Sequence, residues 1–169
     1  MQVLVVRHAP AEDREIFALT GKSDDQRPLT EKGIIKMRKN IQGIQQVVPT
    51  IHTIATSPFQ RTQQTANLLA EGFPHAKKMD LSCLEPNGNM QMILDYLKSH
   101  EPLDNVITLV GHEPDLGELV TWLLSGHPDA WFPMKKGAAC LLEFTHDVEA
   151  GEADLLWALT PKQLRQISS

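Results

Sequence analysis

The stretch Val3-Leu4-Val5-Val6-Arg7-His8 decides the architecture of this chain, because a short apolar run ends directly in a cation and an imidazole. Successive apolar, mostly β-branched residues are typical of a strand that is buried on both faces of a sheet. Such a strand needs helices over both faces, which favours an α/β protein. The two polar side chains would then lie just beyond the carboxyl end of the strand.

Strands and helices alternate along the rest of the chain. Further strands are predicted at Ile51–Thr56, Met79–Leu84 and Val106–Val110, with a final hairpin of Ala139–Phe144 and Asp154–Ala158. The charged stretch Ala11–Arg27 is interpreted as a surface loop. The alternation predicts a single domain over residues 1–169, with a three-layer α/β/α fold around a mainly parallel sheet.

Capping residues and apolar spacing mark the helices. Thr30 is suited to cap a helix whose apolar residues recur at intervals of three and four, namely Ile34, Met37, Ile41, Ile44 and Val48. Ser57 reads as the N-cap of the next helix, with Pro58 at its first position. Two more helices are predicted, one over Asn89–Lys98 with Met92 and Leu97 as core contacts, and one with an apolar stripe from Leu116 to Leu124.

Composition narrows the class of protein. The chain has 169 residues and a formal net charge of -5, which argues against general nucleic-acid binding because that relies on excess basic charge. Its apolar runs are far shorter than a membrane span, so no membrane association is expected. The two cysteines, Cys83 and Cys140, lack the spacing of a disulfide framework or zinc site, and a cytoplasmic location is predicted.

Cations and imidazoles follow three of the predicted strands. Arg7-His8 follows the first strand, Arg61 lies in the first turn after Ile51–Thr56, and His112 follows Val106–Val110. Ligands of open α/β sheets bind beyond the carboxyl ends of the strands, so parallel neighbours would bring these four side chains together. Two guanidinium groups and two imidazoles suit a phosphate or sulfate ion, because arginine matches oxyanion geometry. One histidine could then attack phosphorus, with no need for a metal or other cofactor.

Three segments resemble the histidine phosphatase superfamily. They are Arg7-His8-Ala9, the run from Ser57-Pro58-Phe59 through Arg61 to Ala66, and Val110-Gly111-His112-Glu113-Pro114, in the order of that family. The short chain and Arg27-Pro28-Leu29-Thr30 ahead of the first long helix are most similar to the small phosphohistidine phosphatases of the SixA type. The resemblance implies a phosphoglycerate mutase-like fold and hydrolysis of a phosphorylated protein or small molecule.

The resemblance also implies roles for individual residues. His8 corresponds to the phosphorylated nucleophile, and Arg7, Arg61 and His112 to the residues that bind the phosphoryl group. Arg27 corresponds to an arginine near the same pocket. Ala9 stands where the family commonly has glycine, which would strain the loop only if the backbone needed a glycine-specific angle.

A carboxylic acid after the third strand protonates the leaving oxygen in broader members of the family, and Glu85 lies in the matching region. An imidazole leaving group depends less on such an acid than an alkoxide does. Three functions therefore stay open: removal of phosphate from a protein histidine, hydrolysis of small phosphomonoesters with Glu85 as general acid, and phosphate recognition without turnover. The first is the leading hypothesis.

Overall fold

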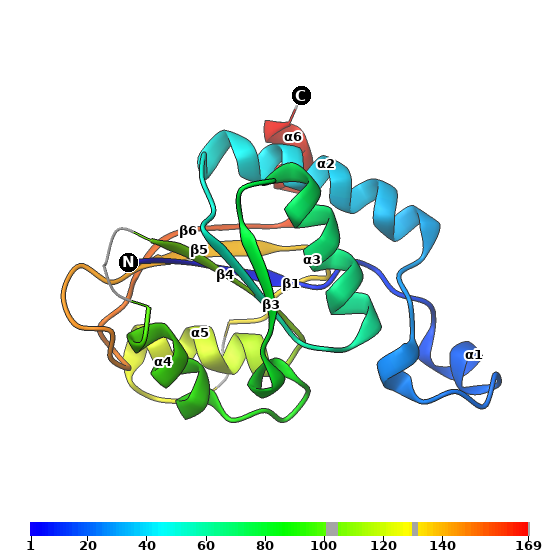
Figure 1. Ribbon diagram of the computed structural model, residues 1–169, viewed down its shortest axis with the longest axis horizontal. Coiled ribbons are helices and arrows are strands. Elements are labelled where there is room, and N and C mark those ends of the chain that lie inside the picture. Colours follow the sequence, from blue (N-terminus) through cyan, green and yellow to red (C-terminus); the bar gives the residue numbers. More distant parts are fainter. Residues whose placement is uncertain (101–104, 130–131, 169) are drawn as a thin grey trace.

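A computed structural model describes residues 1–100, 105–129 and 132–168. One six-stranded sheet runs through its centre in the order β3-β2-β4-β1-β5-β6 (Figure 1). The first four strands in this order are parallel to one another, whereas β5 pairs antiparallel with both β1 and β6. The prediction of a mainly parallel sheet is confirmed.

The strands are β1 (Gln2–Arg7), β2 (Thr53–Thr56), β3 (Lys77–Asp80), β4 (Val106–Gly111), β5 (Ala139–Glu143) and β6 (Asp154–Leu159). The helices are α1 (Arg14–Ala18), α2 (Glu31–Val47), α3 (Gln60–Gly72), α4 (Met90–Lys98), α5 (Asp115–Ser125) and α6 (Pro161–Ile167), with 3-10 turns η1 (Asp24–Gln26) and η2 (Ser82–Leu84). Helices α2, α3 and α6 cover one face of the sheet, and α4 and α5 cover the other (Figure 1). This is the three-layer arrangement that the alternation predicts.

Alternate residues of β1 contribute to the two layers of the core. Val3 and Val5 belong to the apolar cluster beneath α4 and α5, whereas Leu4 and Val6 belong to the cluster beneath α2 and α3. All four side chains are fully buried. A strand with no solvent-facing side must be apolar at every position, which explains why the sequence shows a continuous run instead of alternation.

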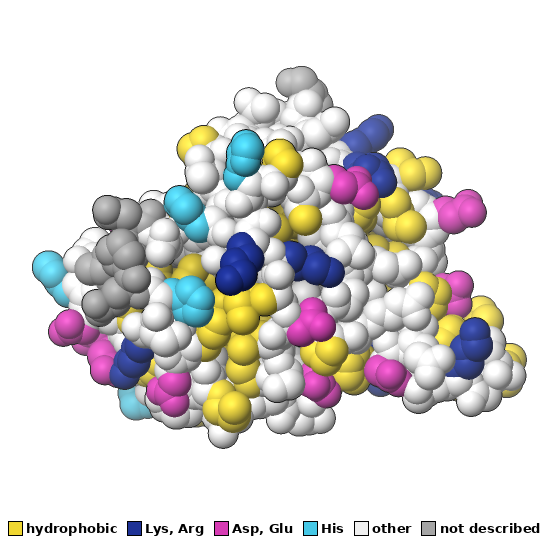
Figure 2. Space-filling model, in the orientation of Figure 1, with side chains coloured by type: hydrophobic (Ala, Val, Ile, Leu, Met, Phe, Trp, Pro, Cys, Tyr) yellow, Lys and Arg dark blue, Asp and Glu magenta, His cyan; other side chains and the backbone are white. Residues whose placement is uncertain are grey.

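The segment from Ala11 to Arg27 is not simply the surface loop that its charge suggests. Asp13 caps α1 by accepting hydrogen bonds from the backbone N–H groups of Glu15 and Ile16, and Phe17 is buried beneath the helix. Helix α1 projects from the body of the molecule, and hydrophobic and charged side chains lie together on that lobe (Figures 1 and 2). A five-residue helix gives a weak periodic signal, so local capping and one buried aromatic decide its formation.

The start of α3 also differs from the prediction. The helix begins at Gln60 with Phe59 as its N-cap, and Ser57 lies before it. Ser57 does not cap the helix because its hydroxyl lies 3.0 Å from Nε2 of His112, and it receives only a long 3.4 Å hydrogen bond from the N–H of Phe59. Arg61 nevertheless stays in the first turn of α3, as expected.

Three smaller differences concern the edges of the fold. The third strand ends at Asp80, and the following residues form η2 because the chain turns away from the sheet there. Met92 is 54% exposed, so the prediction that it contacts the core is wrong, whereas Leu97 is buried together with Ile93 and Leu94. None of the helices within the described ranges combines the length and apolar character needed to cross a bilayer.

The register of the parallel strands aligns their carboxyl ends. Arg7 pairs with Gly111 across β1 and β4, and Thr56 pairs with Val110 across β2 and β4. The next residue of each strand is therefore His8, His112 or Ser57. Backbone hydrogen bonds from His8 to Gly111 and from Ser57 to Val110 extend the pairing by one step. The residues that follow β1, β2 and β4 thus lie together at one edge of the sheet.

Candidate active site

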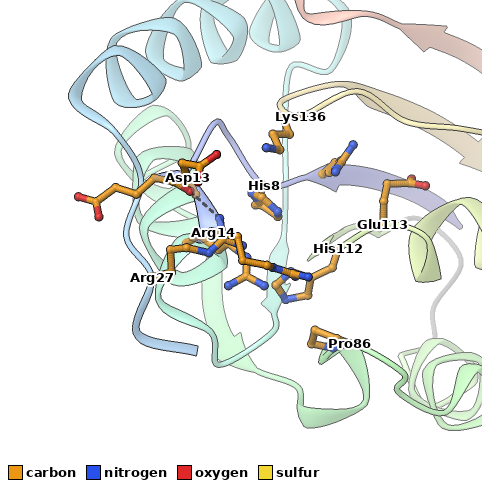
Figure 3. A pocket seen from close by; sticks show the side chains of 12 residues that line it. His8, Asp13, Arg14, Arg27, Pro86, His112, Glu113 and Lys136 are labelled. Carbon is orange, nitrogen blue, oxygen red and sulfur yellow. Dashed lines mark hydrogen bonds between the residues drawn. The ribbon is translucent and has the colours of Figure 1, made fainter. Parts of the chain in front are cut away.

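A cavity of about 420 Å³ opens at this edge of the sheet. Cationic and imidazole side chains dominate its wall (Figure 3). The lining residues are Arg7, His8, Ala11, Glu12, Asp13, Arg14, Arg27, Arg61, Pro86, His112, Glu113 and Lys136. Five cations against three carboxylates on a chain of net charge -5 make the cavity a local concentration of positive charge. Such a site suits a small anion.

His8 follows β1 and is 4% exposed. Its Nδ1 lies 2.7 Å from the carbonyl oxygen of Ala9, which can only accept, so Nδ1 carries the ring proton and donates it there. The proton on Nδ1 leaves a lone pair on Nε2, which is the form of imidazole that acts as a nucleophile. Ala9 itself has no positive φ, so alanine adopts this backbone without the strain that a glycine-only angle would cause.

His112 follows β4 and packs beside His8, with ring centroids 5.4 Å apart. Its Nε2 is hydrogen-bonded to the Ser57 hydroxyl, whereas its Nδ1 is buried and has no partner among the described residues. Phe59 contacts the ring edge at 5.1 Å between centroids. These contacts from β2 and the start of α3 hold the His112 ring in one orientation.

Burial keeps both imidazoles neutral. It is the largest effect that lowers the pKa of His8 to about 3, and Arg61, Arg7 and Lys136 add to it by charge repulsion. Burial followed by the charge of Arg61 likewise lowers the pKa of His112 to about 3. His8 therefore keeps its Nε2 lone pair at neutral pH.

Arg7, at the end of β1, and Arg61, in the first turn of α3, have unsatisfied donors and are called the strand-end arginines below. Arg7 donates from Nη1 to the carbonyl oxygen of Met134 at 2.6 Å, and Arg61 donates from Nη1 to the carbonyl oxygen of Asp24 at 2.8 Å. The Nε atoms of both arginines are buried without a hydrogen-bond partner in the described part of the chain. Burial lowers the pKa of each guanidinium. Donors left unpaired inside a cationic pocket favour an oxyanion as the ligand.

Arg27 reaches the pocket from the segment that follows α1. It is 6% exposed, donates from Nε to Asp24 Oδ1 at 2.7 Å, and donates from Nη1 to the carbonyl oxygen of Glu12 at 2.7 Å. Asp24 also pairs through Oδ2 with Nη2 of Arg61 at 3.1 Å. The Asp24 carboxylate therefore connects Arg27, which follows η1, to Arg61 of α3.

Five of the six residues singled out in the sequence line this pocket: Arg7, His8, Arg27, Arg61 and His112. Glu85, offered as a general acid, does not line it, although its neighbour Pro86 does. Glu85 lies half-buried at the end of η2, where its carbonyl oxygen accepts a hydrogen bond from the N–H of Gly88. The η2 turn brings the proline, and not the glutamate, to the pocket.

A carboxyl group that does line the pocket near Arg7 belongs instead to Glu113. It lines the pocket and accepts a hydrogen bond from the backbone N–H of Met134, the residue whose carbonyl oxygen receives Arg7. Burial raises the pKa of this carboxyl. The sequence offers one indication of this role, because Glu113 immediately follows His112. The sequence does not show, however, that the Glu113 side chain points into the pocket.

Lys136 is a pocket residue that the sequence pattern does not indicate. Gly137, with φ of 80°, donates its N–H to the carbonyl oxygens of both Arg7 and His8 and thereby brings its neighbour Lys136 to the pocket (Figure 3). A positive φ suits glycine, so the glycine after two lysines is the local clue. Burial and then the charges of Arg7 and Arg27 lower the pKa of Lys136.

The chain resembles known proteins along nearly its whole length. It is 34% identical to an uncharacterised protein of Picosynechococcus sp., over 97% of this chain and 99% of that one. It is 28% identical to the phosphohistidine phosphatase SixA of Escherichia coli, over 98% of this chain and 97% of that one. The family description of the histidine phosphatase superfamily (branch 1) matches residues 3–85.

Solved structures give the same answer for the fold. A structure of the protein histidine phosphatase SixA complexed with tungstate superimposes with a TM-score of 0.79 at 26% identity, over 97% of this chain and 99% of that chain. A phosphoglycerate mutase of Plasmodium falciparum superimposes with a TM-score of 0.65 at 14% identity, over 92% and 88% of the two chains. The fold is phosphoglycerate mutase-like, and the chain belongs to the histidine phosphatase superfamily, a family of phosphatases.

Proposed function

We propose that this protein is a phosphohistidine phosphatase that removes phosphate from a histidine of another protein through a phosphorylated His8. The observation that carries the proposal is the contact of His8 Nδ1 with the Ala9 carbonyl oxygen, which directs Nε2 of the ring to the pocket chemistry. Nδ1 donates to this carbonyl oxygen, and Nε2 keeps a lone pair in a pocket lined by three strand-end partners, Arg7, Arg61 and His112. The similarity to SixA, a phosphohistidine phosphatase, supports the same conclusion.

The first step transfers the phosphoryl group to His8. Nε2 attacks phosphorus and forms a P–N bond, while the P–N bond to the substrate imidazole breaks and its electron pair stays on the substrate nitrogen, which takes a proton from solvent. Arg7, Arg61 and the unpaired Nδ1 of His112 are suited to stabilise the equatorial oxygens as charge redistributes. The developing charge on His8 is stabilised by the Ala9 carbonyl oxygen.

The second step releases phosphate. Water attacks phosphorus, the P–N bond to His8 breaks, and its electron pair returns to Nε2 while both protons of the water leave with the product as dihydrogen phosphate. The openness of the pocket on the side of Arg14 and Lys136 gives water access, since both side chains are exposed. Neutral His8 is then regenerated, in the form that its lowered pKa favours.

The test is a trapping experiment with a phosphohistidine-bearing domain. After rapid mixing, half of the sample is quenched in acid and half in base, because phosphohistidine survives base and hydrolyses in acid. The proposal expects a base-stable, acid-labile phosphate on His8 and release of inorganic phosphate. His75→Ala, at an exposed histidine that does not line the pocket, is the matched control. Absence of turnover by the folded protein would reject the proposal, and binding without turnover would favour a recognition module.

A second candidate, hydrolysis of small phosphomonoesters, is favoured by one observation. An alkoxide leaving group needs a proton donor, and the carboxyl group of Glu113 lines the pocket with a raised pKa. Glu113→Gln should then slow hydrolysis of an alkyl phosphate much more than hydrolysis of an aryl phosphate with a good leaving group. An equal effect on both substrates excludes Glu113 as that donor.

A further inference from the structure

Asp24 makes more contacts with the arginines of the pocket than any other carboxylate among the described residues. Its Oδ1 accepts from Nε of Arg27 at 2.7 Å, its Oδ2 lies 3.1 Å from Nη2 of Arg61, and its backbone carbonyl oxygen accepts from Nη1 of Arg61 at 2.8 Å. Nε of Arg14 lies 3.6 Å from Oδ1. Asp24, in η1, thus contacts an arginine of α1, the arginine that ends η1 and an arginine of α3.

The Asp24 carboxylate contacts these arginines without lining the cavity. Arg14, Arg27 and Arg61 line the pocket, whereas Asp24 does not. The side chains of Arg27 and Arg61 are only 7% and 2% exposed, so each has few alternative partners. Hydrogen bonds to a charged group restrict a guanidinium in direction as well as in position. Bonds from Asp24 therefore leave the remaining N–H groups of the arginines free to face a ligand.

Charge alone predicts the opposite effect of Asp24. A carboxylate beside a phosphate site repels the bound anion, and its charge stays negative at neutral pH because its contacts with Arg27 and Arg61 lower its pKa despite partial burial. If Asp24 acted only through its charge, neutralising it would tighten phosphate binding. If it acts by holding the arginines, neutralising it would weaken binding. The two roles differ in sign.

We propose that Asp24 is a positioning residue, which lies outside the pocket lining and orients Arg27 and Arg61 for the phosphoryl group. This orienting effect outweighs the repulsion between the Asp24 carboxylate and that group. The inference rests on the proposed function only in taking phosphate as the ligand. It assigns the segment between α1 and α2 a part in phosphate binding, because η1 supplies both Asp24 and, at its end, Arg27. Without Asp24, the two buried guanidinium groups would lose their shared partner and repel each other.

The experiment measures the dissociation constant of inorganic phosphate by calorimetry for three variants. Asp24→Asn removes the charge with little change in shape. Asp25→Asn removes the same charge from the next residue of η1, which is exposed and forms no ion pair with a described residue, and is the matched control. Asp24→Glu keeps the charge and moves it by one methylene. Thermal unfolding is recorded for each variant to establish that it is folded.

Phosphate binding is expected to weaken about tenfold or more in Asp24→Asn and to stay unchanged or tighten slightly in Asp25→Asn. Asp24→Glu should lie between the wild type and Asp24→Asn, since its charge is kept and its position is altered. Tighter or unchanged binding in Asp24→Asn overturns the proposal, as does Asp24→Glu binding no better than Asp24→Asn. If Asp24→Asn does not fold, the comparison of Asp24→Glu with the wild type decides, and equal or tighter binding in Asp24→Glu overturns the proposal.

The readout separates this inference from the proposed function. Phosphate binding requires no turnover, so the arginine arrangement can be tested even if the chain does not act on phosphohistidine. Conversely, a trapped phosphate on His8 with unchanged phosphate affinity in Asp24→Asn would support the proposed function and reject the role of Asp24.

Discussion

Two groups of residues line the pocket, and they are built differently. The strand-end group, Arg7, His8, Arg61 and His112, comes from β1, β4 and the first turn of α3, and three of its members are at most 4% exposed. The loop group, Glu12, Asp13, Arg14 and Arg27, comes from the segment around α1, and the Arg14 side chain is 75% exposed. The sheet fixes Arg7, His8 and His112, and α3 together with Asp24 fixes Arg61. Local caps and ion pairs fix the second group. Chemistry should depend on the first group far more steeply than on the second.

The largest loss is expected from His8→Ala. Without Nε2 no covalent phosphoryl intermediate can form, so turnover of a phosphohistidine domain should fall on the order of 10⁵-fold. Steady-state phosphate release measures the effect. Phosphate binding should persist, because the strand-end arginines remain. Turnover within tenfold of the wild type would show that His8 is not the nucleophile.

Arg61→Ala should cost about 10²- to 10³-fold in turnover, because the guanidinium is buried and its remaining donors have no substitute. Arg61→Lys should recover little, since an ammonium cannot supply two directed N–H groups. The rates of both variants are compared with that of Arg38→Ala, a surface arginine paired with Glu71 away from the pocket. Equal rates for Arg61→Ala and Arg38→Ala would contradict the role of Arg61.

Acid should destabilise the fold through the strand-end group. The unfolded chain binds protons on His8 and His112 near pH 6.5, whereas the folded chain binds them only near pH 3, so stability falls as the pH drops through this window. Each imidazole contributes about 1.4 kcal/mol per pH unit. Urea unfolding between pH 7 and pH 5 should show a flatter pH dependence in a His8→Gln/His112→Gln double variant. Parallel pH profiles would show that the two histidines do not account for the loss.

Ser57→Ala tests whether the hydroxyl of Ser57, directly after β2, orients the His112 ring. Loss of the hydroxyl removes the hydrogen bond to Nε2 at a cost of about 1 kcal/mol, or about fivefold in turnover. Ser99→Ala is a matched control at a serine in the C-cap of α4. A Ser57→Ala rate equal to the wild-type rate would mean that packing against Phe59 is enough to orient His112.

The smallest effect is expected in the loop group. Arg14→Ala should change turnover by less than about threefold, because an exposed arginine 3.6 Å from Asp24 contributes little in water. The measurement is the turnover of the phosphohistidine domain, together with its KM at low and high salt. A loss as large as that of Arg61→Ala would show that Arg14 closes onto the substrate, and the contrast between the two groups would fail.

The same contrast explains what the sequence can predict. Val3 to Val6 and the strands around Val106 and Ala139 carry a continuous apolar pattern, so the sheet and the residues that follow its strands can be inferred. The three segments that resemble the family also indicate which residues form the strand-end group. Arg27 is also recognisable through its Pro-Leu-Thr context, although its partner Asp24 is not.

The rest depends on contacts between distant residues. Ser57 looks like an N-cap in the sequence, and only its hydrogen bond to His112 shows its actual role. Lys136 reaches the pocket through the turn at Gly137, and Glu85 misses it because η2 turns the chain. Ser57 and Lys136 are placed by hydrogen bonds to other parts of the chain, whereas Glu85 is placed by the local η2 turn, so apolar spacing alone predicts none of the three.

The position of β1 in the sheet also has a consequence during synthesis. Its two neighbours, β4 and β5, both follow it by about 100 residues or more, so β1 leaves the ribosome well before either strand that pairs with it. An apolar strand with open edges is prone to aggregate, and pairing over such long sequence separations is slow. The nascent protein therefore carries an unpaired apolar strand until β4 and β5 have been made, and His8, which follows that strand, joins His112 in the pocket only after β4 is in place.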